Sequence, residues 1–141
     1  MWETFTKTVS RYFHFLETEF GFVRKTMNPP NVIYVSDKLQ VQVYYDVNGR
    51  HELDLGLRRL ADDPRKPLSL GIGMLMRLKD GQDTVGYPSP FPSTEKALET
   101  EVRNLAELLH NYGSDVLKGD LHGFERMEQL DKELAKKFGP K

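Results

Sequence analysis

The first segment of the chain has apolar residues at steps of three and four. These residues are Phe5, Val9, Phe13, Leu16 and Phe20. That spacing places them on one stripe of an α-helix and predicts a helix over residues 4–20. Thr4 can cap its start, and Gly21 can end it in the left-handed conformation. Three more aromatic residues widen the stripe and indicate either a thick core or an exposed contact surface: Trp2, Tyr12 and Phe15.

Two segments between residues 39 and 57 alternate strictly between apolar and polar residues. The apolar positions are Leu39, Val41, Val43 and Tyr45, then Leu53, Leu55 and Leu57. Alternation with a period of two predicts half-buried strands of an antiparallel sheet. Residues 32–35 form a third strand, which is apolar on both sides. Its inward row could be Val32 with Tyr34 or Ile33 with Val35, and the pattern leaves both open.

The turn between the two alternating strands can be predicted from burial. A three-residue loop over residues 47–49 pairs Val43 with Leu53 and Asp46 with Arg50, which puts both apolar rows on one face. A two-residue loop would put the rows on opposite faces, so burial favours the longer loop. Gly49 then takes the left-handed position of that turn.

Three helical segments follow. Residues 69–79 fit both a helix and a strand; length and end signals favour a helix capped by Ser69 and stopped by Gly81. Ser93 opens the next helix, and Gly113 ends it. Its apolar positions are Leu98, Val102, Leu105, Leu109 and Tyr112. The last helix runs from Asp120 to Phe138, and its buried positions are Phe124, Met127, Leu130, Leu134 and Phe138.

Together these elements predict a single α+β domain over residues 1–141. It has an N-terminal helix, a three-stranded antiparallel meander, a short helix and two C-terminal helices packed on the sheet. Helices then cover the apolar face of the sheet.

Composition narrows the possible partners. The formal net charge is −1, from 20 basic and 21 acidic residues, so sequence-independent nucleic-acid binding is disfavoured. No apolar stretch approaches the ~20 residues of a membrane span, and the N-terminal segment does not resemble a signal peptide. Cysteine is absent, which excludes thiol chemistry. We therefore expect a cytoplasmic protein that binds neither nucleic acid nor membrane.

The segment from Leu108 to Leu130 is the richest in chemical groups. A metal site there would use His110, Asp115, Asp120 and His122, but their spacing fits no recognised ligand pattern. The structural alternative accounts for these residues locally. His110 would lie in the last turn of its helix, Ser114 or Asp115 would cap a single following turn, and Asp120 would cap the last helix. The sequence therefore favours helix ends over a metal site.

Other motifs predict no catalytic centre and no cofactor. The stretch GIGMLM lacks the third glycine of a dinucleotide-binding loop and has no βαβ unit around it. The sequence contains neither a phosphate-binding loop nor a nucleophile elbow. His14 and His51 are isolated, and no acid–base pair has a partner that would tune it. These observations favour a protein that is not an enzyme.

Three aromatic residues are candidates for partner binding: Tyr44, Tyr87 and Phe91. Aromatic side chains contribute large contact areas at interfaces. The alternative is that all three complete the core.

Several short motifs resemble small uncharacterised bacterial single-domain proteins, some of which look like immunity proteins that neutralise a toxin by binding it. The motifs are Phe20-Gly21-Phe22, Val43-Tyr44-Tyr45-Asp46, Leu105-Ala106-Glu107-Leu108-Leu109, Tyr112-Gly113, Gly119-Asp120 and Phe124-Glu125-Arg126. This resemblance implies a binding function.

Three functions remain in view. The first is a non-enzymatic binding protein, with toxin neutralisation as one form. The second is a small-molecule-binding protein or an unfamiliar enzyme, with a pocket between sheet and helices closed by residues 87–92. The third is a self-assembling structural component, which would cover its excess apolar surface with a second copy.

Overall fold

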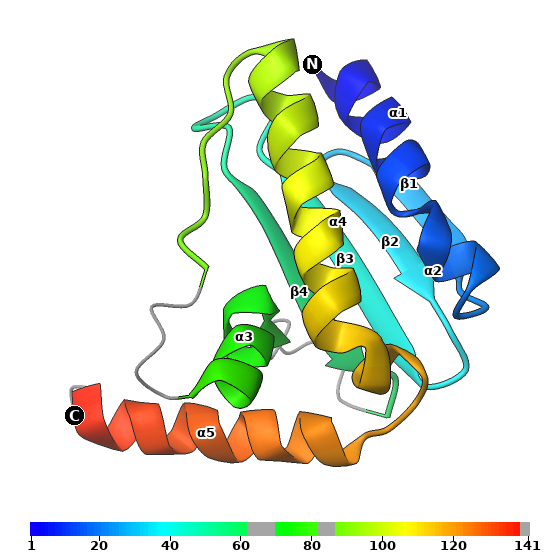
Figure 1. Ribbon diagram of the computed structural model, residues 1–141. Helices are drawn as coiled ribbons and strands as arrows, with labels where there is room; N and C mark the ends of the chain where they lie inside the picture. Colours follow the sequence, from blue (N-terminus) through cyan, green and yellow to red (C-terminus); the bar gives the residue numbers. More distant parts are fainter. Residues whose placement is uncertain (62–69, 82–86, 139–141) are drawn as a thin grey trace.

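A computed structural model describes residues 1–61, 70–81 and 87–138. Its elements are α1 (Trp2–Tyr12), α2 (His14–Thr18), β1 (Val23–Asn28), β2 (Asn31–Val35), β3 (Leu39–Tyr45), β4 (Leu53–Arg59), β5 (Leu70–Gly71), α3 (Ile72–Asp80), α4 (Glu95–Leu117) and α5 (His122–Phe138). The predicted α+β class is confirmed. Helices α1 and α4 lie side by side over the sheet, and α5 runs across one end (Figure 1).

The strands form one antiparallel sheet in the order β1-β2-β3-β4-β5. The expected three-stranded meander is therefore wrong, because β1 precedes it and the two-residue β5 follows it. Strand β1 escaped prediction because it is an edge strand that is exposed at five of its six positions. A strand without a buried face shows no alternation of apolar and polar residues.

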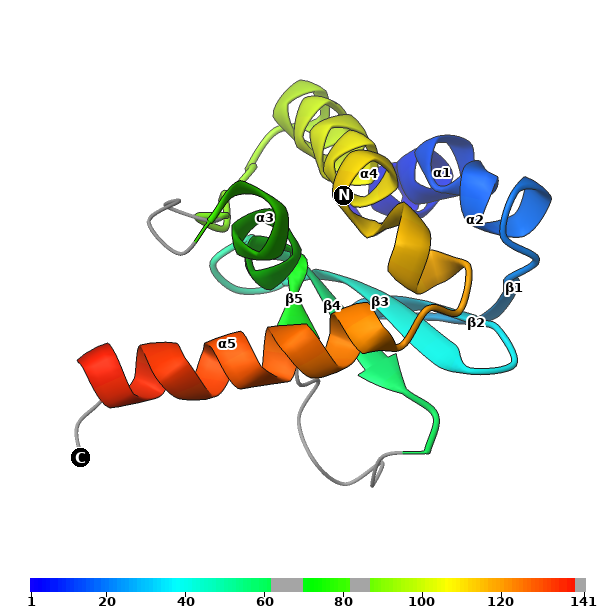
Figure 2. The ribbon, with the colours of Figure 1, turned by 60° about the horizontal axis from the view of Figure 1, so that its bottom comes forward.

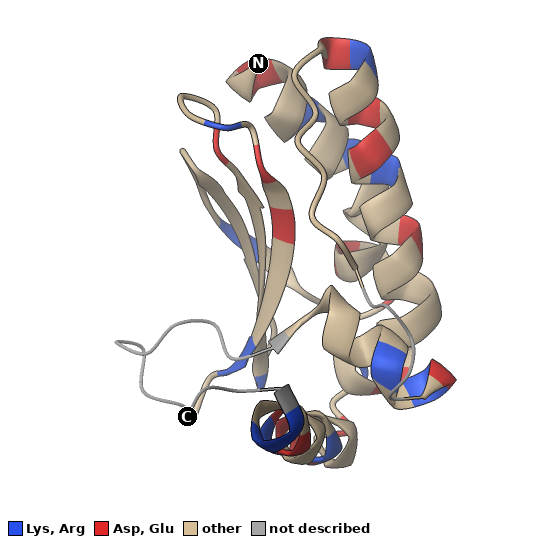
Figure 3. Ribbon diagram, turned by 90° about the vertical axis from the view of Figure 1, so that its left-hand side faces the viewer, with Lys and Arg blue, Asp and Glu red and all other residues tan. Residues whose placement is uncertain are grey.

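Helices lie on only one side of the sheet in the described part of the chain (Figure 3). The rows that face them are buried at every second position of β2, β3 and β4. Val32 and Tyr34 form the buried row of β2, whereas Ile33 and Val35 are half-buried on the uncovered face. This observation decides the question that the sequence left open for residues 32–35.

The loop between β3 and β4 differs from the prediction. Both apolar rows do share one face, but Val43 pairs with Leu55 instead of Leu53. The loop spans residues 47–51, and the left-handed residue is His51, with φ 64°, instead of Gly49. The carboxylate of Asp46 folds into the loop and accepts a hydrogen bond from the amide of Arg50 (2.8 Å). A Cβ atom at Gly49 would overlap that carboxylate, so any other residue there would displace the side chain of Asp46.

The predicted N-terminal helix is two helices, α1 and α2, that meet at Phe13, where ψ is 10°. The expected stripe is buried as far as Leu16, and Phe20 is half-buried. The Thr4 cap is wrong, because α1 starts at Trp2 and has no side-chain cap. The predicted left-handed stop at Gly21 is confirmed, with φ 73°.

Both expectations for residues 69–79 hold in part. Leu70 and Gly71 form β5, which pairs with β4, and the helix α3 begins only at Ile72. Ser69, the predicted cap, lies outside the described residues. Gly81 ends α3 with φ 105°, as predicted.

Helix α4 is longer than predicted. Its cap is Thr94, whose hydroxyl accepts a hydrogen bond from the amide of Ala97 (3.1 Å), and Ser93 lies one residue outside. The helix passes through Gly113 and continues to Leu117, so Gly113 is not the stop. Gly113 instead allows a close approach, since an added Cβ atom would lie 3.3 Å from Cδ1 of Leu75 in α3.

The connection to α5 follows the prediction more closely. Gly119 turns the chain with φ 102°, and a carboxylate oxygen of Asp120 accepts a hydrogen bond from the amide of His122 (3.1 Å). Three of the five predicted apolar positions of α5 are buried: Phe124, Met127 and Leu130. Leu134 is half-buried, and the side chain of Phe138 lies outside the described part.

Helix α5 packs against α3 and across the end of the sheet (Figure 2). Arg59 at the end of β4 joins the sheet to α5. Its guanidinium lies 2.9 Å from Glu128 and 4.9 Å from the ring centre of Phe124, and both residues belong to α5. Within the described residues, no helix combines the length and apolar character that a membrane span requires.

Candidate functional site

A groove of about 520 Å³ lies where α1 and α2 meet the outer side of α4. Tyr12 and Phe15 line one wall, and Leu108 lies on the other. The packing of α1 on α4 buries Phe5 and Val9, and this leaves the two aromatic residues half-buried at the boundary between the helices. Arg103 and Glu107, which follow the same side of α4, add opposite charges to the groove.

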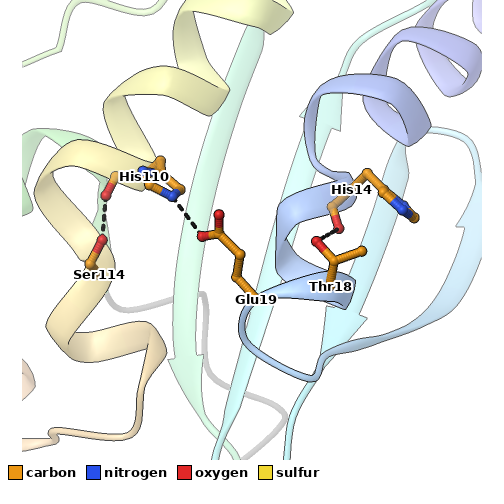
Figure 4. Close-up of polar contacts among 5 residues, drawn as sticks. All are labelled: His14, Thr18, Glu19, His110 and Ser114. Atoms are coloured by element: carbon orange, nitrogen blue, oxygen red, sulfur yellow. Dashed lines mark hydrogen bonds and ion pairs between the residues drawn. The ribbon is translucent and has the colours of Figure 1, made fainter.

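His110 lines one part of the groove and is bound by Glu19 (Figure 4). Nε2 of His110 lies 2.7 Å from Oε2 of Glu19, at the end of the N-terminal helical segment. The ring of Phe15 meets the imidazole edge-on, with 4.9 Å between the ring centres, and Phe20 lies at 6.1 Å. Both side chains are about half exposed, so a molecule that binds in the groove can reach them.

The hydroxyl groups beside this pair serve the backbone. Ser114 Oγ donates to the carbonyl oxygen of His110 (2.5 Å), and Thr18 Oγ1 donates to that of His14 (3.4 Å) (Figure 4). A serine or threonine nucleophile activated by a histidine would instead have its hydroxyl bonded to the imidazole. Here the two hydroxyl groups are bonded to the helix backbone, and the imidazole is bonded to Glu19.

The four candidate metal ligands do not come together. His110 binds Glu19, and Asp120 binds the amide of His122. His122 is 91% exposed, with only Glu125 nearby at 3.7 Å. Asp115 is exposed inside α4. No group of three or more His, Asp or Glu side chains in the part of the chain that the structure describes is arranged to hold a metal ion.

Two structural roles expected for this segment are wrong because α4 continues past Gly113. His110 does not lie in the last turn of its helix, which ends at Leu117. Ser114 and Asp115 lie inside the same helix, so neither caps a new turn.

The three aromatic candidates lie outside the groove. Tyr44 is half-buried on the uncovered face of the sheet, opposite Asp54. Phe91 is exposed beneath the guanidinium of Arg50, 5.1 Å from the ring centre. The hydroxyl of Tyr87 is buried and has no hydrogen-bond partner among the described residues. The segment that carries Tyr87 and Phe91 lies along the start of β4.

A second hollow, of about 290 Å³, lies on the uncovered face of the sheet. It lies where Gly56 and Gly71 pair across two strands and present no side chains. Tyr44, Glu52 and Asp54 line it. Burial raises the pKa of Asp54, and the nearby charge of Glu52 raises it further.

The sequence predicts a pocket between the sheet and the helices, whereas this groove is lined by helices alone. Tyr12 and Phe15 stand out in the sequence because they widen the apolar stripe of the N-terminal helix beyond what one helix interface needs. Glu19 had no signal, because its contact with His110 spans 91 positions and depends on the packing of α2 beside α4.

Comparison with protein-family models, curated proteins and solved structures finds no match for this chain. The resemblance to small bacterial immunity-like proteins stays a prediction. The function is therefore inferred from the geometry of the surface.

Proposed function

We propose that this protein acts by binding another protein in the groove between the N-terminal helices and α4. The observation that carries the proposal is the combination of an aromatic wall with an accessible polar pair. Tyr12 and Phe15 supply the wall, and the Glu19–His110 pair supplies hydrogen-bonding groups beside it. Interfaces are enriched in aromatic residues, which provide much of the binding energy when a partner buries them.

The groove is better suited to a side chain or helix of a protein than to catalysis. One imidazole nitrogen of His110 is occupied by Glu19, and the neighbouring hydroxyls of Ser114 and Thr18 are bonded to backbone carbonyls. The opposite charges of Arg103 and Glu107 would fix the orientation of a partner more than they would raise its affinity.

Neutralisation of a toxin in the cytoplasm is one concrete form of this proposal. An immunity-type protein needs a preformed surface and no chemistry of its own. The groove is formed by packed helices, so its surface is already ordered. Binding of a partner would therefore cost little conformational entropy in this protein.

A matched pair of variants tests the proposal. Leu108→Arg places a charge in the groove, whereas Leu60→Arg makes the same change at an exposed position after β4. Quantitative affinity capture from host cells should recover a specific protein with the wild type and with Leu60→Arg, and Leu108→Arg should lose it. Equal recovery with both variants, each shown by circular dichroism to be folded, would contradict the proposal.

A further inference from the structure

The two edges of the sheet differ in how they are protected. At the β4 side, the amide of Leu53 donates to the carbonyl oxygen of Pro90 (3.0 Å), and β5 pairs with Gly56 and Leu57. At the other side, β1 pairs with β2 alone, and within the described residues no segment lies against its outer edge. Strands β1 and β5 lie at opposite edges of the sheet (Figure 2). An uncovered edge strand carries unpaired amide and carbonyl groups that can accept another strand.

Exposed apolar side chains accompany this free edge. Val23 is 60% exposed and Met27 is 37% exposed, and they are two of the four large apolar residues that are exposed in the described part of the chain. Val23 pairs with Val35 and therefore lies on the uncovered face of the sheet, beside the half-buried Ile33. A strand placed next to β1 could extend this apolar row.

The charge of the edge indicates what kind of strand would fit. Residues 20–36 contain Arg24 and Lys25 and no acidic residue, although the whole chain has a net charge of −1. Arg24 lies on the other face from Val23, where its guanidinium donates to Ser10 Oγ (2.6 Å). Lys25 lies at an irregularity in the β1–β2 pairing and is exposed. An incoming strand would meet Val23 on one face of the sheet and Arg24, together with Met27, on the other, with Lys25 exposed between them.

The same charges oppose a second copy of this chain. Antiparallel pairing of β1 with itself would bring two arginines and two lysines together within six residue pairs. In that register the four positive side chains lie on neighbouring residue pairs, where like charges repel one another. Positive residues at a free edge commonly serve to prevent such self-association.

We propose that the free edge of β1 binds an extended acidic segment of another protein, which adds to the sheet as a further strand. The segment combines apolar residues, which continue the row of Val23, with acidic residues, which pair with the exposed charges of Arg24 and Lys25. Its main-chain hydrogen bonds supply affinity and its alternating side chains supply specificity. At the usual rise of a strand, six paired residues extend over about 20 Å. This surface is separate from the helical groove.

A pair of peptides with opposite charge tests the proposal on the intact chain. One is a capped peptide of alternating glutamate and valine, and the other has lysine in place of glutamate. Amide hydrogen exchange followed by NMR should show slower exchange within Val23–Asn28 with the acidic peptide only, and the effect should weaken with added salt. Unchanged exchange in β1 with the acidic peptide, or equal slowing by both peptides, would overturn the proposal.

Charge reversal locates the contact. The double change Arg24→Glu and Lys25→Glu should weaken the affinity for the acidic peptide by about tenfold. Two lost charge pairs at a strand contribute roughly 1.4 kcal/mol together. Lys96→Glu, at the exposed start of α4, should leave the affinity for the acidic peptide unchanged.

A dimer of the chain alone, seen by ultracentrifugation and lost on changes in β1, would also overturn the proposed occupant. Leu108→Arg should leave peptide binding intact, which separates this site from the groove.

Discussion

His110 and Glu19 join α4 to the end of the N-terminal helical segment, with 2.7 Å between Nε2 and Oε2. The pair sets the position of the imidazole beside Phe15 and Phe20. Its half exposure means that water competes for both groups, so the pair contributes more to the shape and polarity of the groove than to the stability of the fold.

A double-mutant cycle on this pair should therefore give a small coupling energy. We expect Glu19→Gln and His110→Gln to be coupled by less than about 1 kcal/mol in the free energy of unfolding, as for other exposed ion pairs. Urea denaturation of the four proteins measures it. A coupling of several kcal/mol would show that the pair is a main support of the fold.

Two buried tyrosines should respond differently to loss of their hydroxyl groups. Tyr45 donates to the carbonyl oxygen of Pro92 (2.8 Å) and lies 3.2 Å from Nδ1 of His51. Tyr45→Phe leaves a buried carbonyl without its partner, at a cost of about 1–3 kcal/mol. The buried hydroxyl of Tyr34 has no hydrogen bond of ordinary length among the described residues, although the nearby guanidinium of Arg24 interacts with it, so Tyr34→Phe should cost less than Tyr45→Phe. Equal losses on thermal unfolding would contradict this assignment.

A β-branched side chain at Gly113 should destabilise the protein, because this glycine lies close to the side chains of Leu109 and Leu75. An added Cβ atom would be 3.0 Å from Cδ1 of Leu109 and 3.3 Å from Cδ1 of Leu75. Gly113→Val should destabilise the protein by about 1–3 kcal/mol through overpacking. Asn111→Val, on the exposed side of the same helix, controls for the helix propensity of valine. Equal unfolding free energies for the two variants would show that α3 does not pack closely on this glycine.

The raised pKa of Asp54 gives a pH dependence with a definite sign. Burial moves the pKa above its ordinary value of 3.8, so the folded state holds the proton to a higher pH than the unfolded state. As the pH rises from 3.8 through the raised pKa, the folded state binds more protons than the unfolded state, and the stability contributed by this group falls.

Asp54→Asn should remove that fall and stabilise the protein at neutral pH, while keeping an oxygen to accept from the amide of Leu55 (2.8 Å). Unfolding free energies measured across this pH range, with Asp37→Asn as an exposed control, provide the test. A variant that is less stable than the wild type at neutral pH would show that the carboxylate is stabilised by its surroundings.

The elements that bury one face, such as the central strands, could be predicted from the sequence. The alternating rows that contain Val43 and Leu55 identified the central strands, because a one-residue slip would expose a whole row. Their register was wrong by two residues because such a shift keeps both rows on the same face. The hydrogen bond from the Arg50 amide to the Asp46 carboxylate stabilises the longer loop. This contact is between polar groups, so the pattern of apolar residues could not predict it.

The errors elsewhere have tertiary causes. Glycine often ends a helix, and the sequence therefore predicts a stop at Gly113. In the structure this glycine instead gives room to Leu75, which is distant in sequence. Strand β1 has no buried row to produce a pattern. The contact between Glu19 and His110 depends on how two helical segments pack, so neither residue could be assigned to the groove in advance.

Site-specific photo-crosslinking in host cells tests the proposed binding function most directly. A photoreactive phenylalanine analogue at Asn104 would lie in the groove, and the same analogue at Asn48 would lie in the exposed β3–β4 loop. We expect a discrete adduct with one protein from position 104, lost on Leu108→Arg, and none from position 48. Adducts of equal yield from both positions, or none from position 104, would contradict it.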